Sequence, residues 1–267
     1  MQRTSPSGLA KGRDKMASSI NAKHSVFKAH FPGDPVVPGF MPLSDYLANF
    51  PAGNANHLSI DSLIFRKMIK PDVDFIFERN HSGNILCCNS ENLFFSFRLT
   101  VSKAELSGHT EAFVAKGAEH SVIPLRHPDY WFLPEKIQAD SSFTCASCVI
   151  DTKLAIERSP WIETCAGGVF LLLVEALGNL ALVVNATELE RAVAAESRFV
   201  FVRFSKIRVS TSLMSELDKF MLSTRVTRKG NLLTWEGNVI NGDGTLLLDI
   251  QGAVSMKTHS LQGNVHA

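Results

Sequence analysis

A run of prolines and glycines at residues 30–40, HFPGDPVVPGF, limits the fold more than any other stretch of this chain. Proline fixes its own φ angle and has no N–H, whereas glycine permits backbone angles that other residues avoid. Such a run cannot form an ordinary helix or a central strand, so it predicts a stiff loop of defined shape. Its one strongly reactive side chain belongs to His30, and the question is where the chemical partner of His30 lies.

The longest apolar run, VFLLLVEALGNLALVV, occupies residues 169–184. A membrane-spanning helix needs about 20 predominantly apolar residues. This run is shorter, and Glu175 places a carboxylate in its middle. We therefore expect a helix that is apolar on every side because a soluble protein surrounds it on every side.

Composition and charge exclude several classes of function. The chain has 267 residues, enough for one large domain or two ordinary ones, and its net charge of +1 provides no field for nucleic acid and no polybasic membrane signal. Residues 1–15 contain no apolar core, so they do not resemble a secretory signal. We expect a cytoplasmic protein with no nucleic-acid partner and no membrane span.

The five cysteines support a reducing compartment, because an odd number does not fit a disulfide framework. Cys145 and Cys148 form a C-x-x-C pair, but no second pair follows at the spacing of a zinc site. They also lie in an expected strand, where residues three apart point to opposite faces. We interpret them as small buried residues and expect no metal.

The order of expected elements runs twice along the chain, each time as a helix followed by an antiparallel meander. Residues 107–130 are the expected seam, so the prediction is an N-terminal unit at 1–119 and a C-terminal unit at 120–267, both of the α+β class. In the first unit we expect a strand at 18–29, a helix at 40–50 and strands at 60–69, 73–80, 85–88 and 93–106. In the second we expect a strand at 141–156, a helix at 168–186 and strands at 197–210, 219–229, 232–240 and 246–256.

Three motifs resemble one family, the 3-hydroxyacyl-ACP dehydratases of bacterial fatty acid synthesis, which have the hotdog fold. HFPGDPVVPG at 30–39 resembles their signature loop. IPLRHP at 123–128 resembles their entry motif, and LLVEALGN at 172–179 is similar to their central-helix motif, in which an acid is followed four positions later by an amide. The resemblance implies a double hotdog, with two antiparallel sheets each wrapped around a central helix, similar to the dehydratase domains of polyketide synthases.

The departures from the family pattern are informative. The acid of the family follows the histidine by fourteen positions, which here is Ser44, and we interpret the neighbouring Asp45 as a plain surface charge of its helix rather than a relic acid. The second half has the acid, Glu175, but its corresponding stretch at 159–168, SPWIETCAGG, has no histidine. In this family the histidine of one hotdog and the acid of its neighbour share a site. The resemblance therefore implies one complete site, made of His30 and Glu175.

The residue types fit the elimination of water from a 3-hydroxyacyl thioester. Histidine suits the base that removes the C2 proton, because its unperturbed pKa of roughly 6.5 is close to working pH. A carboxyl group among leucines suits the acid that protonates the departing hydroxyl, since burial favours its neutral form. Asn179 lies four residues after Glu175, on the same helical face, where it is expected to hold that carboxyl or a water.

A third requirement is a group that stabilises the negative charge on the thioester oxygen. Gly39 stands just before the helix that starts near Phe40, where free N–H groups and the helix dipole favour negative charge. The resemblance implies that Gly39 offers its N–H to the thioester carbonyl, and we expect Gly39, Phe40 and Asn179 to contact substrate.

The function that the resemblance implies is dehydration of carrier-protein-bound 3-hydroxyacyl thioesters to trans-2-enoyl thioesters in fatty acid or polyketide-type synthesis. It implies no metal and no nucleotide, because the phosphopantetheine arm arrives on the acyl carrier protein, and it makes a homodimer an expectation. Two alternatives stay open at this point, a hotdog acyl thioesterase and a non-catalytic subunit that binds acyl chains.

Overall fold

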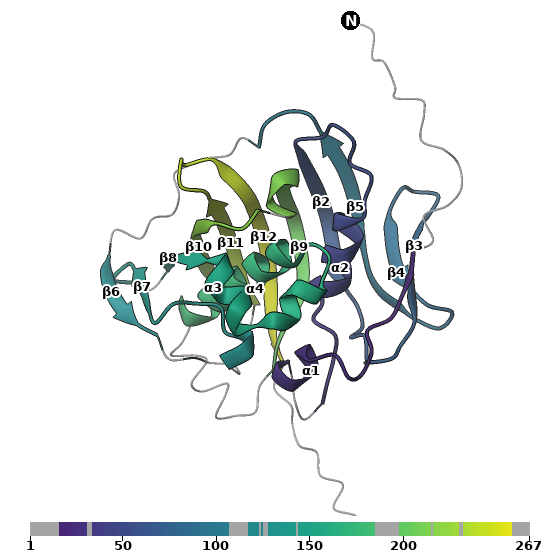
Figure 1. Cartoon of the computed structure of the whole chain (residues 1–267), viewed down its shortest axis with the longest axis horizontal. Helices are drawn as coiled ribbons and strands as arrows, with labels where there is room; N and C mark the ends of the chain where they lie inside the picture. Colours follow the sequence, from purple (N-terminus) through teal and green to yellow (C-terminus); the bar gives the residue numbers. More distant parts are fainter. Residues whose placement is uncertain are drawn as a thin grey trace, which may run out of the picture.

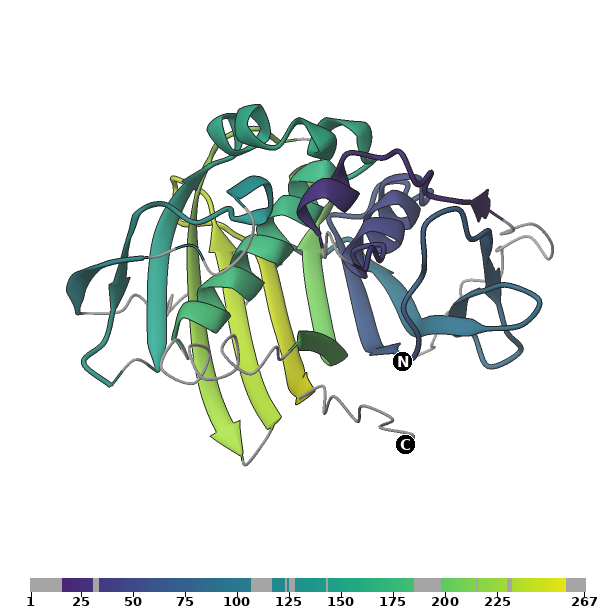
Figure 2. The same ribbon diagram turned by 90° about the horizontal axis from the view of Figure 1, so that it is seen from below.

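The computed structural model describes residues 16–30, 34–106, 117–122, 124, 128–142, 144–184, 198–214, 216–229 and 232–257. Within these residues the backbone forms a single antiparallel sheet of twelve strands, in the order β1-β3-β4-β5-β2-β9-β12-β11-β10-β8-β7-β6 (Figure 1). The α-helices all lie on one side of this sheet (Figure 2). The predicted α+β class is therefore confirmed.

The first half of the sheet comes from the first half of the chain. Its strands bury alternate side chains, as in β3, where the positions facing the helices are Phe75 and Phe77. The elements are β1 (Met16–Ser18), α1 (Val26–Ala29), α2 (Phe40–Ala48), β2 (His57–Phe65), β3 (Phe75–Arg79), β4 (Ile85–Cys88) and β5 (Leu93–Ser102).

The second half follows the same plan with longer strands and a longer helix. Its elements are β6 (Ala118–Ser121), η1 (Pro128–Tyr130), β7 (Lys136–Ala139), β8 (Cys145–Asp151), α3 (Thr152–Arg158), η2 (Pro160–Thr164), α4 (Gly168–Val184), β9 (Arg198–Ser210), η3 (Thr211–Met214), β10 (Lys219–Lys229), β11 (Leu232–Ile240) and β12 (Leu246–Lys257).

The two halves are joined by one strand pair, β2 with β9. These strands are antiparallel, and their register runs from His57 opposite Ser210 to Ile64 opposite Arg203. The two sheets expected from the sequence are consequently the two halves of one continuous sheet. The division at residues 119 and 120 stays a prediction, since strands up to Ser102 lie in one half and strands from Ala118 lie in the other.

Helix α4 is the buried helix predicted from the apolar run. Every residue from Val169 to Val184 is buried, because the helix packs on β8, β10 and β11 on one side and on α2 and η2 on the other. Among the described residues, no helix is both long enough and apolar enough to cross a membrane.

Two expected strands were wrong, and both errors fall just before a loop that leads into a central helix. Of the expected strand at 18–29, only Ser18 lies in a strand, and residues 26–29 form α1. Of the expected strand at 141–156, residues 145–151 form β8, but α3 begins at Thr152. In α3 the buried positions are Thr152, Ala155 and Ile156, which is the spacing of one helical face. Most of the expected seam, residues 107–116, 123 and 125–127, lies outside the described residues.

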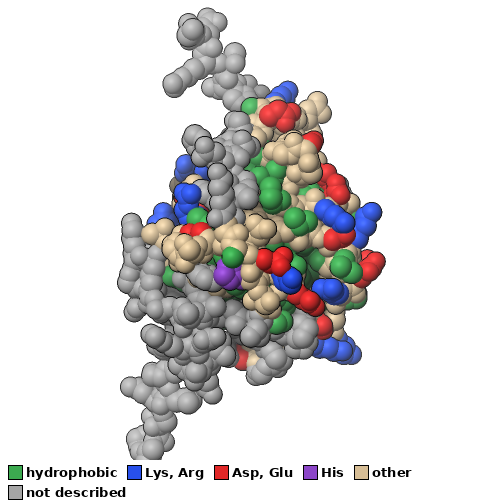
Figure 3. All heavy atoms as spheres, turned by 90° about the vertical axis from the view of Figure 1, so that its left-hand side faces the viewer, with side chains coloured by type: hydrophobic (Ala, Val, Ile, Leu, Met, Phe, Trp, Pro, Cys, Tyr) green, Lys and Arg blue, Asp and Glu red, His purple; other side chains and the backbone are tan. Residues whose placement is uncertain are grey.

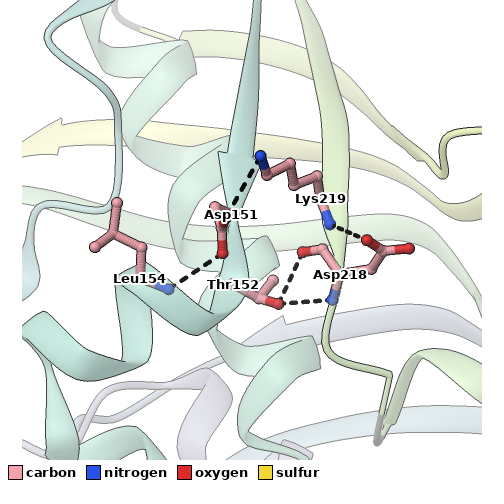
Figure 4. A network of polar contacts seen from close by, with 5 residues as sticks. All are labelled: Asp151, Thr152, Leu154, Asp218 and Lys219. Atoms are coloured by element: carbon pink, nitrogen blue, oxygen red, sulfur yellow. Dashed lines mark hydrogen bonds and ion pairs between the residues drawn. The ribbon is translucent and has the colours of Figure 1, made fainter.

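Polar contacts start α3 at a defined residue (Figure 4). The side chain of Asp151 accepts a hydrogen bond from the N–H of Leu154 at 3.2 Å, which is an N-cap. The buried Thr152 hydroxyl donates to the carbonyl of Asp218 at 2.9 Å and accepts from its N–H at 3.0 Å. These bonds satisfy backbone groups at the beginning of α3 and tie it to the chain that enters β10.

The outer edge of the sheet at β6 and β7 is polar. Figure 3 views the molecule from this side, and cationic and anionic side chains alternate over its described surface. Lys136 of β7 and Glu119 of β6 form an ion pair of 2.7 Å between exposed side chains. An exposed pair contributes little to stability, but charges on an edge discourage pairing with another sheet.

An aromatic cluster fills the junction between the halves. Phe40 of α2 contacts Phe204 of β9 at a centroid distance of 4.9 Å, and Phe204 contacts Trp235 of β11 at 5.9 Å. Gly252 of β12 pairs with both Phe204 and Trp235 across the sheet, and the two rings lie over it. A Cβ atom at Gly252 would approach Phe204 Cδ1 to 2.7 Å and Trp235 Nε1 to 2.9 Å, so only glycine leaves room for both rings.

We predict that Gly252→Ala destabilises the protein, because a methyl group would displace two fully packed rings. The expected loss in the free energy of unfolding is about 1–3 kcal/mol, measured by urea denaturation. Gly242→Ala is the matched control, since a Cβ there meets no atom within 4 Å. Equal stability of the two variants would contradict this view of the junction.

Candidate active site

His30 is held in one orientation by its own loop. It follows α1 as the C-cap residue, and its N–H donates to Val26 O at 2.8 Å. The imidazole is buried, with 8% of its surface exposed, and its Nδ1 lies 2.8 Å from Val36 O. A carbonyl oxygen only accepts hydrogen bonds, so Nδ1 carries the proton and Nε2 of the neutral ring carries the lone pair. Residues 31–33 of the predicted loop lie outside the described residues.

The rest of the loop is attached to the turn that follows β2. The N–H of Val37 donates to Ile69 O at 2.9 Å, and Asp34 forms an ion pair with Lys70. Both charged side chains are about half exposed, so the pair contributes little by itself. The loop therefore takes its shape from prolines and backbone hydrogen bonds rather than from surface charge.

Gly39 is the N-cap of α2, as predicted. A Cβ atom at this position would lie 2.9 Å from Cε1 of Phe65, so a side chain here would press against a ring at the end of β2. The first N–H groups of a helix have no partner within the helix, and the positive end of the helix dipole lies beside them. This end of α2 is suited to a developing negative charge.

Glu175 and Asn179 lie one turn apart on α4, with 4% and 1% of their surfaces exposed. Asn179 Nδ2 donates to the backbone carbonyl of Tyr130 at 3.3 Å, so this amide bonds to the chain that enters the second half. Residues four apart on a helix face the same way, with Cβ atoms about 5–6 Å apart. Glu175 therefore lies on the same face of α4 as Asn179.

Tyr130 connects the predicted residues and was missed by the sequence reasoning. Its ring lies 4.8 Å from the ring of His30 and stacks on Trp161 at 5.6 Å with an interplanar angle of 5°. Its carbonyl accepts from Asn179. The structure thus brings His30 of the first half and the polar face of α4 to one buried tyrosine. The available signal was the aromatic stretch Tyr130–Phe132 directly after the entry motif.

Phe40 is fully buried, with 0% of its surface exposed. Its ring lies against Phe65 at 5.6 Å, Phe204 at 4.9 Å and Phe170 at 6.5 Å, which makes it part of the junction core. Its predicted contact with substrate stays a prediction, as do the substrate contacts of Gly39 and Asn179.

Asp45 is not the plain surface charge expected from the sequence. It lies on the face of α2 that packs against the turn before α4, and its Oδ1 is buried without a hydrogen-bond partner. Burial raises the pKa of Asp45 to about 6, and a hydrogen bond from the N–H of Ala166 partly offsets that rise. Asp45 and Asn49 also repeat the acid–amide spacing of Glu175 and Asn179.

Ser159 is the C-cap residue of α3, as His30 is of α1, and its hydroxyl donates a 2.8 Å hydrogen bond to Asp129 O. The nearby thiol of Cys165 is buried, and burial together with the Asp45 carboxyl raises its pKa to about 12. A thiol with such a pKa is protonated at neutral pH and a poor nucleophile. Among the described residues, no three histidine, cysteine or acidic side chains converge as metal ligands.

The raised pKa of Asp45 predicts a pH-dependent stability. The pKa of Asp45 is about 6 in the folded protein and 3.8 in the unfolded chain, so the folded protein binds the Asp45 proton more tightly. This difference stabilises the fold fully below pH 3.8, and the stabilisation is lost as pH rises through about 6. The Asp45→Asn side chain cannot ionise, so the variant should not lose this stability as the pH rises. We expect the melting temperature of the variant, relative to wild type, to be higher at about pH 8 than at about pH 5. A difference that does not change with pH would show that Asp45 ionises freely in the folded protein.

Comparisons with known proteins agree with this fold. Residues 10–107 match the model of a family described as ApeI-like, ApeI dehydratase. This portion contains the loop with His30, all of α2 and the first five strands. A search of curated proteins found no match.

Solved structures resemble the whole chain. The dehydratase domain of PpsC from Mycobacterium tuberculosis, in complex with C12:1-CoA, superposes with a TM-score of 0.63 at 13% identity over 91% of this chain and 93% of that one. The dehydratase domain from the CurJ module of curacin polyketide synthase gives 0.61 at 11% identity over 94% of both chains. A monomeric dehydratase domain from a trans AT polyketide synthase split module gives 0.62 at 11% identity over 91% and 98%. Residues 10–107 therefore match the ApeI-like dehydratase family, and the chain as a whole has the double-hotdog fold of polyketide-synthase dehydratase domains.

Proposed function

We propose that this chain dehydrates 3-hydroxyacyl thioesters carried on an acyl carrier protein to trans-2-enoyl thioesters, with His30 as base and Glu175 as acid. The observation that carries the proposal is the hydrogen bond from His30 Nδ1 to Val36 O. The lone pair of the ring is then on Nε2, in a buried position next to Tyr130. The backbone carbonyl of Tyr130 accepts a hydrogen bond from Asn179 of α4, the helix that also carries Glu175. A fixed base and a buried acid then come from the two halves of one chain.

The proposed reaction balances without a redox cofactor or a metal. Nε2 of His30 removes a proton from C2, and the electron pair of that bond becomes the C2–C3 double bond. The C3–O bond breaks, and the carboxyl proton of Glu175 goes to the departing hydroxyl, which leaves as water. The proton taken by His30 then returns to Glu175 through solvent, so the enzyme regains its starting form.

The environment of each group favours its part in this reaction. Glu175 is buried in the apolar surroundings of α4, and burial in general favours the neutral form of a carboxyl group. The N–H of Gly39 at the start of α2 is the proposed donor to the thioester oxygen as charge develops on it, since the Met41 N–H already donates to Pro38 O and Pro42 has no N–H. The carrier-bound form of the substrate is part of the proposal, supported by the fold shared with polyketide-synthase dehydratase domains. The homodimer stays a prediction.

The test uses intact-protein mass spectrometry with a panel of 3-hydroxyacyl-carrier proteins. We expect wild type to remove one water from the acyl carrier, and we expect His30→Asn and Glu175→Gln to lower the rate by about 10²–10⁴-fold. His30→Asn is chosen because its amide can still donate to Val36 O, so the loop keeps its shape while the base is lost. His30→Ala removes both.

The matched controls are His81→Ala and Glu91→Gln, which change exposed side chains on the turns after β3 and β4 and should keep wild-type rates. Release of free acid from the carrier, unaffected by His30→Asn, would replace the proposal with a thioesterase. Stable binding without conversion on any chain length would replace it with a non-catalytic acyl-binding subunit.

A further inference from the structure

His24 links the two halves of the chain close to the candidate site. Its Nε2 lies 2.9 Å from the hydroxyl of Thr164, which ends η2 in the second half. Its Nδ1 accepts a hydrogen bond from the N–H of Val26, the first residue of α1, at 3.2 Å. One partly buried imidazole thus bonds to a group two positions away and to another 140 positions away in the sequence.

The protonation state of His24 follows from its partners. The Thr164 hydroxyl donates its proton to Trp161 O at 2.6 Å, so its oxygen can only accept from His24. Nε2 of His24 therefore carries the proton, and Nδ1 carries the lone pair that Val26 N–H requires. This is the tautomer opposite to that of His30. A proton added to Nδ1 would place two donors against each other and break the bond to Val26.

Val26 connects His24 to the candidate base, His30, through two hydrogen bonds. Its N–H is held by His24, and its carbonyl accepts from the N–H of His30 at 2.8 Å. On the other side, Thr164 is followed after three residues by Gly168, where α4 begins. The contact of His24 with Thr164 therefore connects the backbone at His30 to the turn that starts the helix of Glu175.

We propose that His24, in its neutral form, is a positioning residue that sets His30 relative to α4 through Val26 and Thr164. The inference rests on the proposed function for its effect on turnover, but the contact itself does not. His24 would not touch the substrate, and it would act only through the placement of the base.

The surroundings of His24 favour the neutral ring. Burial lowers the pKa of His24 from its ordinary value. From α1 it faces the ring of Phe27 at a centroid distance of 6.4 Å, and from η2 it faces the uncharged hydroxyl of Thr164. The titratable neighbours along the chain, Lys23 beside His24 and Glu163 beside Thr164, have exposed side chains. A drop in pH would protonate His24 and release Val26.

The activity test compares His24→Ala, Thr164→Val and the double variant with Thr164→Ser, which keeps the hydroxyl. We expect kcat to fall about 10- to 100-fold in each of the first two, with KM changed less than about twofold, because the base is misplaced while substrate binding is not. The double variant should be no slower than the slower single variant, since the two single substitutions break the same connection between His24 and Thr164. Thr164→Ser and the control His81→Ala should keep wild-type kcat. Independent, multiplying effects of the two single variants would overturn the proposal.

A spectroscopic readout separates this inference from the proposed function. In two-bond ¹H–¹⁵N spectra of the full chain labelled with ¹⁵N-histidine, wild type should show His24 protonated at Nε2 and His30 protonated at Nδ1. Thr164→Val and His24→Ala should shift the His30 signals toward a mixture of tautomers, and Thr164→Ser should not. Unchanged His30 signals would overturn the inference even if wild type is an active dehydratase. Shifted signals in a protein that converts no acyl carrier would support the connection and overturn the proposed function.

Discussion

The pairing of β2 with β9 is the constraint on which the rest of the structure depends. It joins two antiparallel sheets into one and places α2 and α4 side by side on the same face. A loop of the first half can then reach a helix of the second, so His30 and the polar turn of α4 meet at Tyr130. The aromatic cluster of Phe40, Phe204 and Trp235 fills the same junction, and it leaves room at Gly252 for nothing larger than hydrogen.

The two halves have become unequal at their equivalent positions. His30 has a fixed tautomer and its ring lies against that of Tyr130, whereas the hydroxyl of Ser159 donates to a backbone carbonyl. The acid Asp45 remains in the first half, where packing against the turn before α4 has made it half-buried and raised its pKa to about 6. A carboxyl in such a place costs stability at neutral pH, because the folded protein favours its protonated form.

Much of the architecture followed from local patterns, because alternating aromatic and β-branched residues between polar turns leave little choice but an antiparallel meander. The strand at 85–88 and those at 219–229 and 232–240 were predicted to the residue. The helices α1 and α3 were wrongly expected as strands. For α3 the N-cap Asp151 and the 3–4 spacing of Thr152, Ala155 and Ile156 were visible, but the apolar content of residues 145–150 dominated the interpretation. Helix α1 has only four residues and is flanked by His24 and His30, which contact Thr164 and Tyr130 of the second half.

The sequence by itself determined the elements and the candidate pair, because proline, glycine and a lone acid in an apolar helix have strong local meanings. The HFPG loop and Glu175 could be recognised without coordinates. Only the tertiary structure decided that His30 and Asn179 both contact Tyr130, that Asp45 is half-buried rather than on the surface, and that His24 bonds to Thr164 of the second half. These facts arise from contacts between residues 49 to 140 positions apart, and such contacts leave no periodic pattern in the sequence.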